Sequence, residues 1–316
     1  MYDTIAVFET QLQKKIIFNF IEIGLIKKKK LLIIDASNHK LKLNELNIDL
    51  NFNKISNIFK SFKNIKALKK LNLKCKTLIS TQFTGINALF FSSFINSDKK
   101  ILIDDGIGTP VLLLDNSLYN RLFRFQLRFY FIKSILRLFF NIKLLSVQKA
   151  TITFDSYYSI YNLGVFFDYK PYEFRYIDGI IQKYDLINKE IGFIGAPMVE
   201  FGLTSEKKLK ALLSKIVKNE GPFSYFLHPD EKYSLDYNIQ GVNFLKPNML
   251  IERYFEIHGV PKTLYSFSSS AALNIATANP QVNVYNIGYE SYFRNKNQVY
   301  LKVLNQFSVK KSFYNL

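Results

Sequence analysis

Residues 4–34 read TIAVFETQLQKKIIFNFIEIGLIKKKKLLII. The segment opens with the apolar run Thr4–Phe8, and apolar residues then recur at helical spacing over Gln11–Ile23, before Gly24. A second apolar run, Leu31–Ile34, follows four consecutive lysines. Two short apolar runs that flank an amphipathic helix predict a strand, a helix and a second strand.

The same alternation continues along the chain. Further strands are expected at Thr77–Ser80, Lys100–Ile103, Ile191–Ile194, Ser224–Leu227, Leu264–Phe267 and Val282–Ile287, and further helices at Lys54–Leu71, Gly85–Ile95, Ser205–Lys218 and Ser270–Thr277. Strands that alternate with helices predict an α/β protein whose mainly parallel sheets are covered on both faces. The 316 residues suffice for two domains. The boundary is expected within Tyr157–Lys189, which gives domains 1–170 and 171–316.

The composition excludes several classes of protein. Hydrophobic residues make up 48% of the chain and charged residues 22%, which is not the balance of a disordered chain. A single cysteine, Cys75, excludes an intrachain disulfide and a cysteine-rich zinc site, and three dispersed histidines do not suggest a metal centre. No run of apolar residues is long enough to span a membrane, and the first residues do not resemble a signal peptide. We therefore expect a cytoplasmic protein with no metal.

The net charge is +18, and most of the excess lies in residues 1–150. Such an excess attracts polyanions, which include nucleic acid and anionic lipid. The segment Leu122–Leu145 interleaves arginines and lysines with aromatic and aliphatic residues and holds no acidic residue. This pattern is typical of a helix that lies on an anionic bilayer, and the alternative is a large core helix with solvated basic residues. The first interpretation predicts peripheral contact with the inner membrane.

Three polar motifs follow predicted strands, where ligands bind in open α/β sheets. They are Asp104-Asp105-Gly106, His228-Pro229 and Ser268-Ser269-Ser270. Adjacent strand residues point to opposite faces, so only one of the two carboxylates is expected to enter a cleft, where it could act as a general base. The alternative is a simple turn. His228, directed by Pro229, could bind a phosphate or protonate a leaving group, or it could belong to a turn. The serines could form an anion site at a helix N-terminus, or one of them could simply cap the helix.

Other common signatures are absent from the sequence. It holds no phosphate loop of the Gly-x-x-x-x-Gly-Lys-Ser/Thr type, no Gly-x-Gly-x-x-Gly after the first strand, no Gly-x-Ser-x-Gly and no His-Glu-x-x-His. These absences argue against a P-loop NTPase, a typical dinucleotide dehydrogenase, a serine hydrolase and a zincin.

The three motifs, in this order, resemble those of the bacterial sialyltransferases. The nearest resemblance is to glycosyltransferase family 52, the lipooligosaccharide sialyltransferases, which are related in motif to the bacterial polysialyltransferases. Thr10-Gln11-Leu12-Gln13 resembles a Thr-Pro-Leu-Gln that often follows their first strand, with Gln11 in place of proline. Phe193-Ile194-Gly195-Ala196-Pro197 resembles their Ile-Gly-Gln-Pro, with Ala196 in place of glutamine.

The resemblance implies a GT-B fold, in which two Rossmann-like domains face a central cleft and the second holds the nucleotide sugar. It implies inverting, metal-independent transfer of sialic acid from CMP-sialic acid to a terminal galactose of a lipooligosaccharide or surface glycan, with no cofactor. Asp104 or Asp105 would be the base, with Asp105 favoured beside the glycine. The donor would be bound by His228, which would also assist phosphate departure, and by Pro229, Glu252, Ser268, Ser269 and Ser270. Glu252 matches the acidic position that binds the ribose.

Other functions stay open at this stage. A glycosyltransferase of the same fold could use another nucleotide sugar, such as a glucosyl donor. A basic nucleic-acid-binding protein would make the charge central, although the positive charge accompanies apolar runs rather than a nucleic-acid motif, so no nucleic acid is expected. A membrane-associated scaffold would leave the strand-end motifs unexplained. The sequence does not decide whether the chain forms a homodimer.

Overall fold

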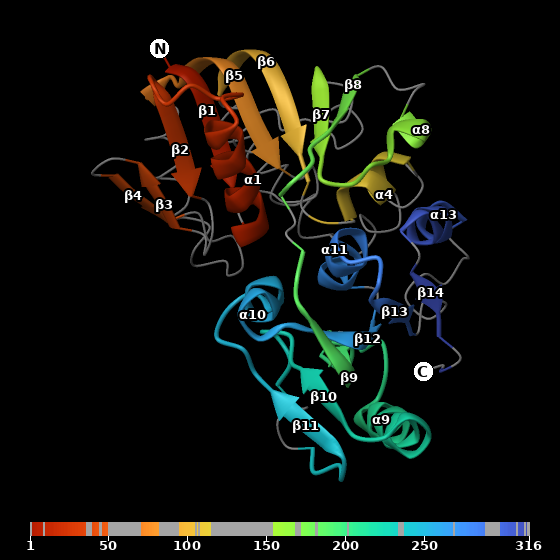
Figure 1. The fold of residues 1–316 in the computed structure, drawn as a ribbon. Helices are drawn as coiled ribbons and strands as arrows, with labels where there is room; N and C mark the ends of the chain where they lie inside the picture. Colours follow the sequence, from red (N-terminus) through yellow and green to blue (C-terminus); the bar gives the residue numbers. More distant parts are fainter. Residues whose placement is uncertain are drawn as a thin grey trace. The chain divides into compact units, whose positions relative to one another are not determined.

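The computed structural model describes most of the chain and divides it into two compact units, Met1–Ile180 and Ile181–Leu316 (Figure 1). The described residues are 2–8, 10–35, 40–43, 46–49, 71–81, 95–104, 106, 108–114, 154–167, 172–180, 183–200, 202–232, 237–267, 269–287, 298–307, 309–312 and 314. The predicted basic helix Leu122–Leu145 lies outside them, as do Asp105 and Ser268. Most of two other predicted helices also lies outside: residues 54–70 of Lys54–Leu71 and residues 85–94 of Gly85–Ile95.

The first unit is built on a parallel sheet of six strands. In spatial order these are β2 (Leu31–Asp35), β1 (Tyr2–Phe8), β5 (Lys74–Thr81), β6 (Asn96–Ile103), β7 (Ser156–Ser159) and β8 (Glu173–Tyr176). The helices are α1 (Gln11–Glu22), α4 (Gly108–Leu114) and α8 (Gly164–Phe167), and β3 (Lys40–Leu43) pairs with β4 (Leu46–Asp49) as a small antiparallel hairpin. The predicted strand–helix–strand start of the chain is thus confirmed.

Helix α1 begins at a capping box. The Gln13 N–H donates to Thr10 Oγ1 over 3.3 Å, and the Thr10 N–H donates to Gln13 Oε1 over 2.9 Å. These reciprocal bonds satisfy two N–H groups that a helix start leaves without partners. Ile16, Ile17 and Phe20 then bury one face of the helix. The structure therefore explains why threonine and glutamine stand three residues apart after the first strand.

The second unit is built on another parallel sheet of six strands. In spatial order these are β11 (Val242–Leu245), β10 (Phe223–Phe226), β9 (Leu186–Ile194), β12 (Val260–Ser266), β13 (Asn283–Asn286) and β14 (Lys310–Lys311). Its helices are α9 (Glu206–Glu220), α10 (Ile251–His258), α11 (Ser270–Ala278) and α13 (Gln298–Gln306). The predicted α/β class with mainly parallel sheets is confirmed in both units.

The strand order of the second sheet reverses between β9 and β12. From β9 the chain proceeds to β10 and β11 on one side, and then returns to β12, β13 and β14 on the other. In such sheets the connections after the two strands at the reversal run to opposite sides of the sheet order, which leaves a crevice between them. Ligands bind in this crevice, beyond the carboxyl ends of the two strands. The register places Phe226, Ile194 and Ser266 side by side as the last paired residues of β10, β9 and β12.

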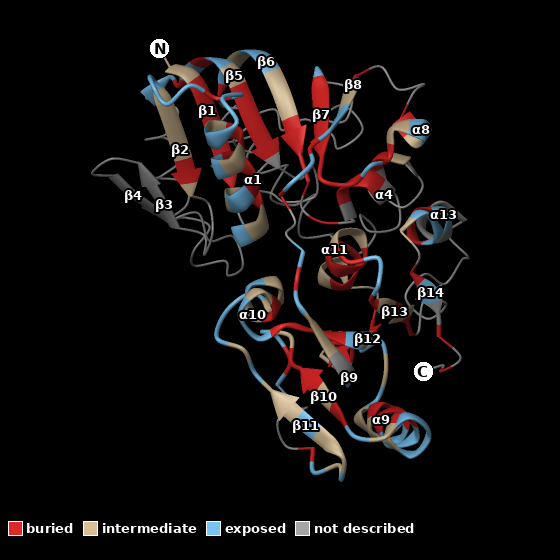
Figure 2. Ribbon diagram, in the orientation of Figure 1, coloured by how far each residue is buried: buried red, intermediate tan, exposed pale blue. Residues whose placement is uncertain are grey.

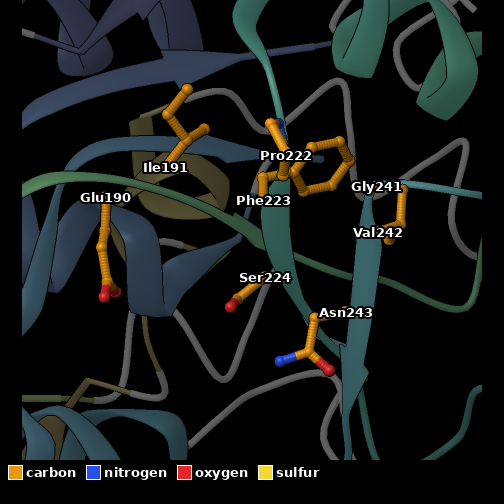
Figure 3. Close-up of a pocket in the computed structure, with 8 residues that line it drawn as sticks. All are labelled: Glu190, Ile191, Pro222, Phe223, Ser224, Gly241, Val242 and Asn243. Atoms are coloured by element: carbon orange, nitrogen blue, oxygen red, sulfur yellow. The ribbon is translucent and has the colours of Figure 1, made fainter.

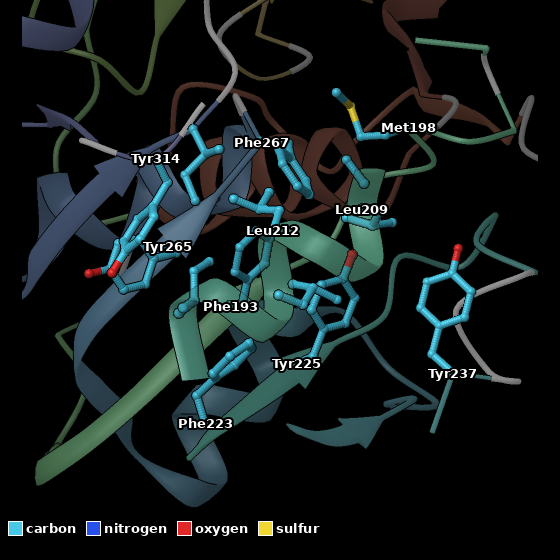
Figure 4. Packing of buried hydrophobic residues seen from close by; sticks show 14 of the residues in the cluster. Phe193, Met198, Leu209, Leu212, Phe223, Tyr225, Tyr237, Tyr265, Phe267 and Tyr314 are labelled. Atoms are coloured by element: carbon cyan, nitrogen blue, oxygen red, sulfur yellow. The ribbon is translucent and has the colours of Figure 1, made fainter. Parts of the chain in front are cut away.

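An aromatic core packs against this sheet (Figure 4). The Phe193 ring of β9 is fully buried, and its centroid lies 5.0 Å from that of Tyr225 and 4.9 Å from that of Phe267. Helix α9 buries Leu209, Leu212, Leu213 and Ile216 in the same cluster. Figure 2 shows the result: α9 is buried on one face and exposed on the other. This packing holds rigid the strands from which the candidate residues emerge.

The structure adds strands where the sequence indicated a boundary. Tyr157–Lys189 contains β8 and most of β7, which extend the first sheet. The two units divide after Ile180, which lies within this range. All four residues of β7 are buried, but their sequence, SYYS, is not an apolar run. Helix α10 and strand β11 were not expected either, because each is short and only partly buried.

Replacing Phe193 by alanine should destabilise the second unit by about 3–5 kcal/mol, because the change leaves a cavity among aromatic rings. Urea unfolding followed by circular dichroism measures the loss. The control is Ile257→Ala on α10, where the side chain is 53% exposed and the change should stay within about 0.5 kcal/mol. Equal losses in the two variants would contradict the core described for Phe193.

Candidate functional site

His228 lies two residues beyond the end of β10. On either side of this end, the Gly195 N–H donates to the Phe226 carbonyl over 2.8 Å and the Leu227 N–H donates to the Leu245 carbonyl over 2.9 Å. These bonds hold the start of the His228 turn against both neighbouring strands. The imidazole is half-buried, so one edge of it stays accessible beyond the sheet.

The contacts of the His228 imidazole define its tautomer. Its Nδ1 accepts a hydrogen bond from the Asp230 N–H over 3.2 Å, whereas the Asp230 carboxylate lies 3.7 Å away, beyond hydrogen-bond distance. Burial lowers the pKa of His228, although Asp230 and Glu200 oppose this shift. A neutral ring whose Nδ1 accepts carries its proton on Nε2. The ring therefore offers an Nε2–H donor.

The turn rests on a buried carboxylate that the sequence analysis missed. Glu231 is 1% exposed; its Oε2 accepts from the His228 N–H over 2.6 Å, and its Oε1 accepts from the Tyr225 hydroxyl over 2.6 Å. The Glu231 N–H in turn donates to the His228 carbonyl over 3.0 Å. Glu231 thus fixes the backbone of His228, and the only sequence signal was an acidic residue three positions after the histidine.

Gly195, the first residue after β9, leaves room for this carboxylate. A Cβ atom built at Gly195 would lie 2.2 Å from Glu231 Oε2 and 2.7 Å from the Tyr225 ring. Neither neighbour can retreat easily, because both are buried and bonded to each other. The glycine of the Phe193–Pro197 motif is therefore required by the contact between the ends of β9 and β10.

The serine motif follows β12, on the other side of β9. Ser269 is the N-cap residue of α11, with extended φ and ψ of −78° and 133°, but its side chain makes no capping hydrogen bond. Ser270 is the first residue of the helix. Ser269 therefore does not have the simple capping role that the sequence left open, because its side chain accepts no hydrogen bond from the first turn of α11. Hydroxyls beside such N–H groups suit an anion.

Glu252 lies on α10, in the first turn of the helix. Its Oε1 accepts a hydrogen bond from Asn274 Nδ2 of α11 over 3.0 Å. The contact joins the helix that carries Glu252 to the helix that begins at the serines. Asn274, which the sequence analysis also missed, thus positions the carboxylate.

The second unit therefore brings together most of the predicted donor-binding residues. His228 and the described serines follow strands that flank β9, and the last paired residues of those strands are two strand spacings, or about 10 Å, apart. Pro229 is exposed in the same turn as His228. His228 and the serines thus follow the carboxyl ends of strands close to the reversal of the strand order, the region where open parallel sheets bind ligands.

In the first unit, Asp104 follows β6 and is fully buried. Its Oδ1 accepts from the Tyr157 hydroxyl, and its Oδ2 accepts from the Ser159 hydroxyl over 2.8 Å and from the Ile160 N–H over 2.6 Å. The donors all come from the end of β7 and the residue after it, not from a local turn. Burial raises the pKa of this carboxyl to about 7, although the three hydrogen bonds oppose the shift.

This placement argues against a catalytic role for Asp104. Asp104 has no exposed surface with which to reach an acceptor and instead joins the ends of β6 and β7. The structure therefore gives Asp104 a role in joining two strands rather than in contacting a substrate. Asp105 itself lies outside the described residues.

A pocket of about 520 Å³ lies elsewhere in the second unit (Figure 3). It is lined by Glu190, Ile191, Pro222, Phe223, Ser224, Gly241, Val242 and Asn243. Phe223 and Val242 are the first residues of β10 and β11, so the pocket lies at the amino ends of these strands. It contains none of the predicted residues and belongs to the edge opposite His228.

Two further features are absent from the described parts of the chain. Among these residues, no three histidine, cysteine or acidic side chains gather in a way that could hold a metal ion. No helix within the same ranges has the length and apolar character needed to cross a bilayer.

No family model matches the chain, and no curated protein matches it. Solved structures do match. An α/β-galactoside α-2,3-sialyltransferase from Photobacterium phosphoreum has a TM-score of 0.50 and 12% identity over 98% of this chain and 99% of its own. MnaA of S. aureus in complex with UDP has a TM-score of 0.52 and 11% identity, over 100% and 93%. A putative UDP-N-acetylglucosamine 2-epimerase from Listeria monocytogenes has a TM-score of 0.53 and 10% identity, over 100% and 85%.

At these identities the likeness shows the fold alone. It assigns the chain to the GT-B fold, in agreement with the fold that the resemblance implied. The matches cover nearly the whole chain, so they include both sheets. They do not select the sialyltransferase family over other families that share this fold.

Asp104→Asn should flatten the pH dependence of stability of the first unit. Because burial raises the folded-state pKa of Asp104 from 3.8 to about 7, the folded chain keeps a proton that the unfolded chain releases between these pH values. This contribution to the free energy of unfolding is fully present below pH 3.8 and is lost as the pH rises through about 7. Urea unfolding of both proteins at several pH values measures the slope, and equal slopes would contradict the assignment.

Proposed function

We propose that the protein is a glycosyltransferase whose second unit binds a nucleotide sugar at the reversal between β9 and β12. The observation that carries the proposal is the placement of His228, Ser269 and Ser270 beyond the carboxyl ends of β10 and β12, on either side of β9. The GT-B fold, which the chain shares with nucleotide-bound enzymes, supports it. We further propose that the donor is CMP-sialic acid and the acceptor is a terminal galactose of a bacterial lipooligosaccharide or other surface glycan.

His228 has the geometry of a phosphate ligand. Its Nδ1 is occupied by the Asp230 N–H, so the Nε2–H is the donor that remains for a substrate. Transfer of the sugar breaks the bond between its anomeric carbon and a phosphate oxygen, and negative charge develops on the leaving phosphate. A fixed Nε2–H donor stabilises that charge, and an approaching phosphate favours the charged imidazolium, which can also give up a proton.

The start of α11 would hold the same phosphate from the other side of β9. Ser269 makes no capping bond with its own helix, and the N–H groups of the first turn carry the positive end of the helix dipole. Ser268 and Pro229 complete the proposed donor-binding set. Glu252, which Asn274 holds against α11, would accept hydrogen bonds from the ribose hydroxyls.

The acceptor would be activated from the first unit. We propose that Asp105 takes the proton of the acceptor hydroxyl while the oxygen of that hydroxyl attacks the anomeric carbon. The bond between the anomeric carbon and the phosphate oxygen breaks at the same time, and its electron pair leaves with CMP. Asp104 would not act as the base, because its carboxylate is buried and already accepts three hydrogen bonds. A single displacement of this kind inverts the anomeric centre and needs no covalent intermediate.

The nucleotide of the donor has one specific alternative, which is UDP. The structure of S. aureus MnaA that matches the chain contains UDP, and an anthocyanidin 3-O-glucosyltransferase in complex with UDP matches with a TM-score of 0.52 and 10% identity over 98% of this chain and 85% of its own. A UDP-sugar is therefore the second candidate donor. The choice of CMP-sialic acid rests on the order of the three motifs.

CMP should raise the melting temperature of the protein more than UDP does. At about 100 times the dissociation constant, a ligand that binds only the folded state adds about 2.7 kcal/mol, or roughly 5–10 °C for a unit of this size. Differential scanning fluorimetry with matched concentrations of CMP and UDP measures the shift. A larger shift with UDP would reject CMP-sialic acid as donor and favour a UDP-sugar.

His228→Ala should lower the transfer rate by about 10²–10⁴-fold without unfolding the second unit, because the leaving phosphate loses its proton and hydrogen-bond donor. The measurement is CMP release from CMP-sialic acid with a lactose-terminated acceptor. His258→Ala is the matched control, since His258 is exposed at the end of α10 and should not affect the rate.

Asp105→Asn should abolish transfer in the same assay, whereas the thermal shift with CMP should persist, because the donor site lies in the other unit. Retained activity in Asp105→Asn together with its loss in a folded Asp104→Asn protein would show that the base was assigned to the wrong aspartate.

A further inference from the structure

The connection between α1 and β2, residues Ile23–Lys30, exposes apolar side chains beside a run of lysines. Ile23 is 55% exposed and Leu25 is 48% exposed, although Ile26 between them and the lysines is 4% exposed. The Ile26 N–H donates to the Phe20 carbonyl over 3.0 Å, which fixes the loop to the end of α1. The loop is therefore anchored at Ile26, while Ile23 and Leu25 stay exposed to solvent.

Lys27, Lys28, Lys29 and Lys30 are all exposed, and no acidic residue lies within the connection. Lys30 has a φ of 60°, in the left-handed region that favours glycine. This backbone is held in place because the Lys30 carbonyl accepts from the Asp3 N–H over 3.0 Å. The sequence thus keeps a fourth positive charge at a position where a glycine would relieve strain.

The start of β5 extends this surface on the other side of β1. Leu71 is 37% exposed, and Lys74 and Lys76 are exposed. Strand β1 pairs in parallel with both β2 and β5, so the starts of those two strands lie at the same edge, about 10 Å apart. Asp3, on β1 between them, forms an ion pair with Lys76 over 3.2 Å. We call this surface the amino-edge patch; its members are Ile23, Leu25, Lys27, Lys28, Lys29, Lys30, Leu71, Lys74 and Lys76.

We propose that the amino-edge patch docks on an anionic lipid bilayer. Clustered lysines are attracted to anionic headgroups, and neighbouring apolar side chains gain by entering the boundary of the acyl chains. A nucleic acid would use the lysines but would give Ile23 and Leu25 no favourable contact, because it is bound mainly through its phosphates. The amino-edge patch belongs wholly to the first unit and includes no proposed donor-binding residue and no residue of Leu122–Leu145.

The test is flotation of the whole protein with two kinds of vesicle, phosphatidylcholine alone and an equal mixture of phosphatidylcholine and phosphatidylglycerol. The wild-type protein should bind the mixed vesicles. The variant K27Q/K28Q/K29Q/K30Q should bind them at least tenfold more weakly, since each lysine near an anionic surface is worth roughly a fivefold change in affinity. The variant I23S/L25S should also bind more weakly, and its loss should persist in high salt, where charge attraction is screened.

The matched control is K207Q/K208Q/K218Q/K246Q, which removes the same charge from exposed positions of the second unit. It should change vesicle affinity less than twofold. An equal loss in this control, or wild-type binding that is the same for both kinds of vesicle, would overturn the proposal. The patch would instead be assigned to nucleic acid if the wild-type protein bound duplex DNA tightly and did not bind vesicles. In that case K27Q/K28Q/K29Q/K30Q should lose DNA binding and I23S/L25S should keep it. Because no sugar donor is present, none of these outcomes depends on the proposed transferase activity.

Discussion

The buried carboxylate of Glu231 organises the carboxyl edge of the second sheet. It accepts hydrogen bonds from the Tyr225 hydroxyl inside the core and from the His228 N–H at the edge. A buried carboxylate without partners would cost several kcal/mol, so these bonds must form when the unit folds. The same atoms exclude any side chain at Gly195. One interaction therefore fixes the ends of β9 and β10 and the direction in which the His228 turn leaves the sheet.

A second buried carboxylate has the corresponding part in the first sheet. Asp104 joins the end of β6 to the end of β7 through Ser159 and the Ile160 N–H. In both units the buried carboxyl group differs from the group proposed to meet the substrate. Buried hydrogen bonds are strong and directional in a medium of low polarity, so they suit the positioning of a loop. A catalytic group must instead reach the substrate.

The two edges of a parallel sheet can serve different contacts. The residues proposed for donor binding lie at carboxyl ends of strands, whereas the amino-edge patch lies where β2 and β5 begin. An eight-residue strand such as β5 spans about 26 Å, which keeps a surface for lipid well apart from residues at the opposite end of the same sheet.

The sequence by itself determined the elements whose signals are local. The apolar spacing of α1 and α9, the apolar strands and the positions of His228 and the serines after strands all depend on near neighbours along the chain. Only the tertiary structure decided that β7 is buried although it reads SYYS, because the partner of its Tyr157 hydroxyl is Asp104, 53 residues earlier. It likewise decided that Glu231 lies beneath the turn and that Asn274 holds Glu252, since hydrogen-bond partners distant in sequence leave no periodic pattern.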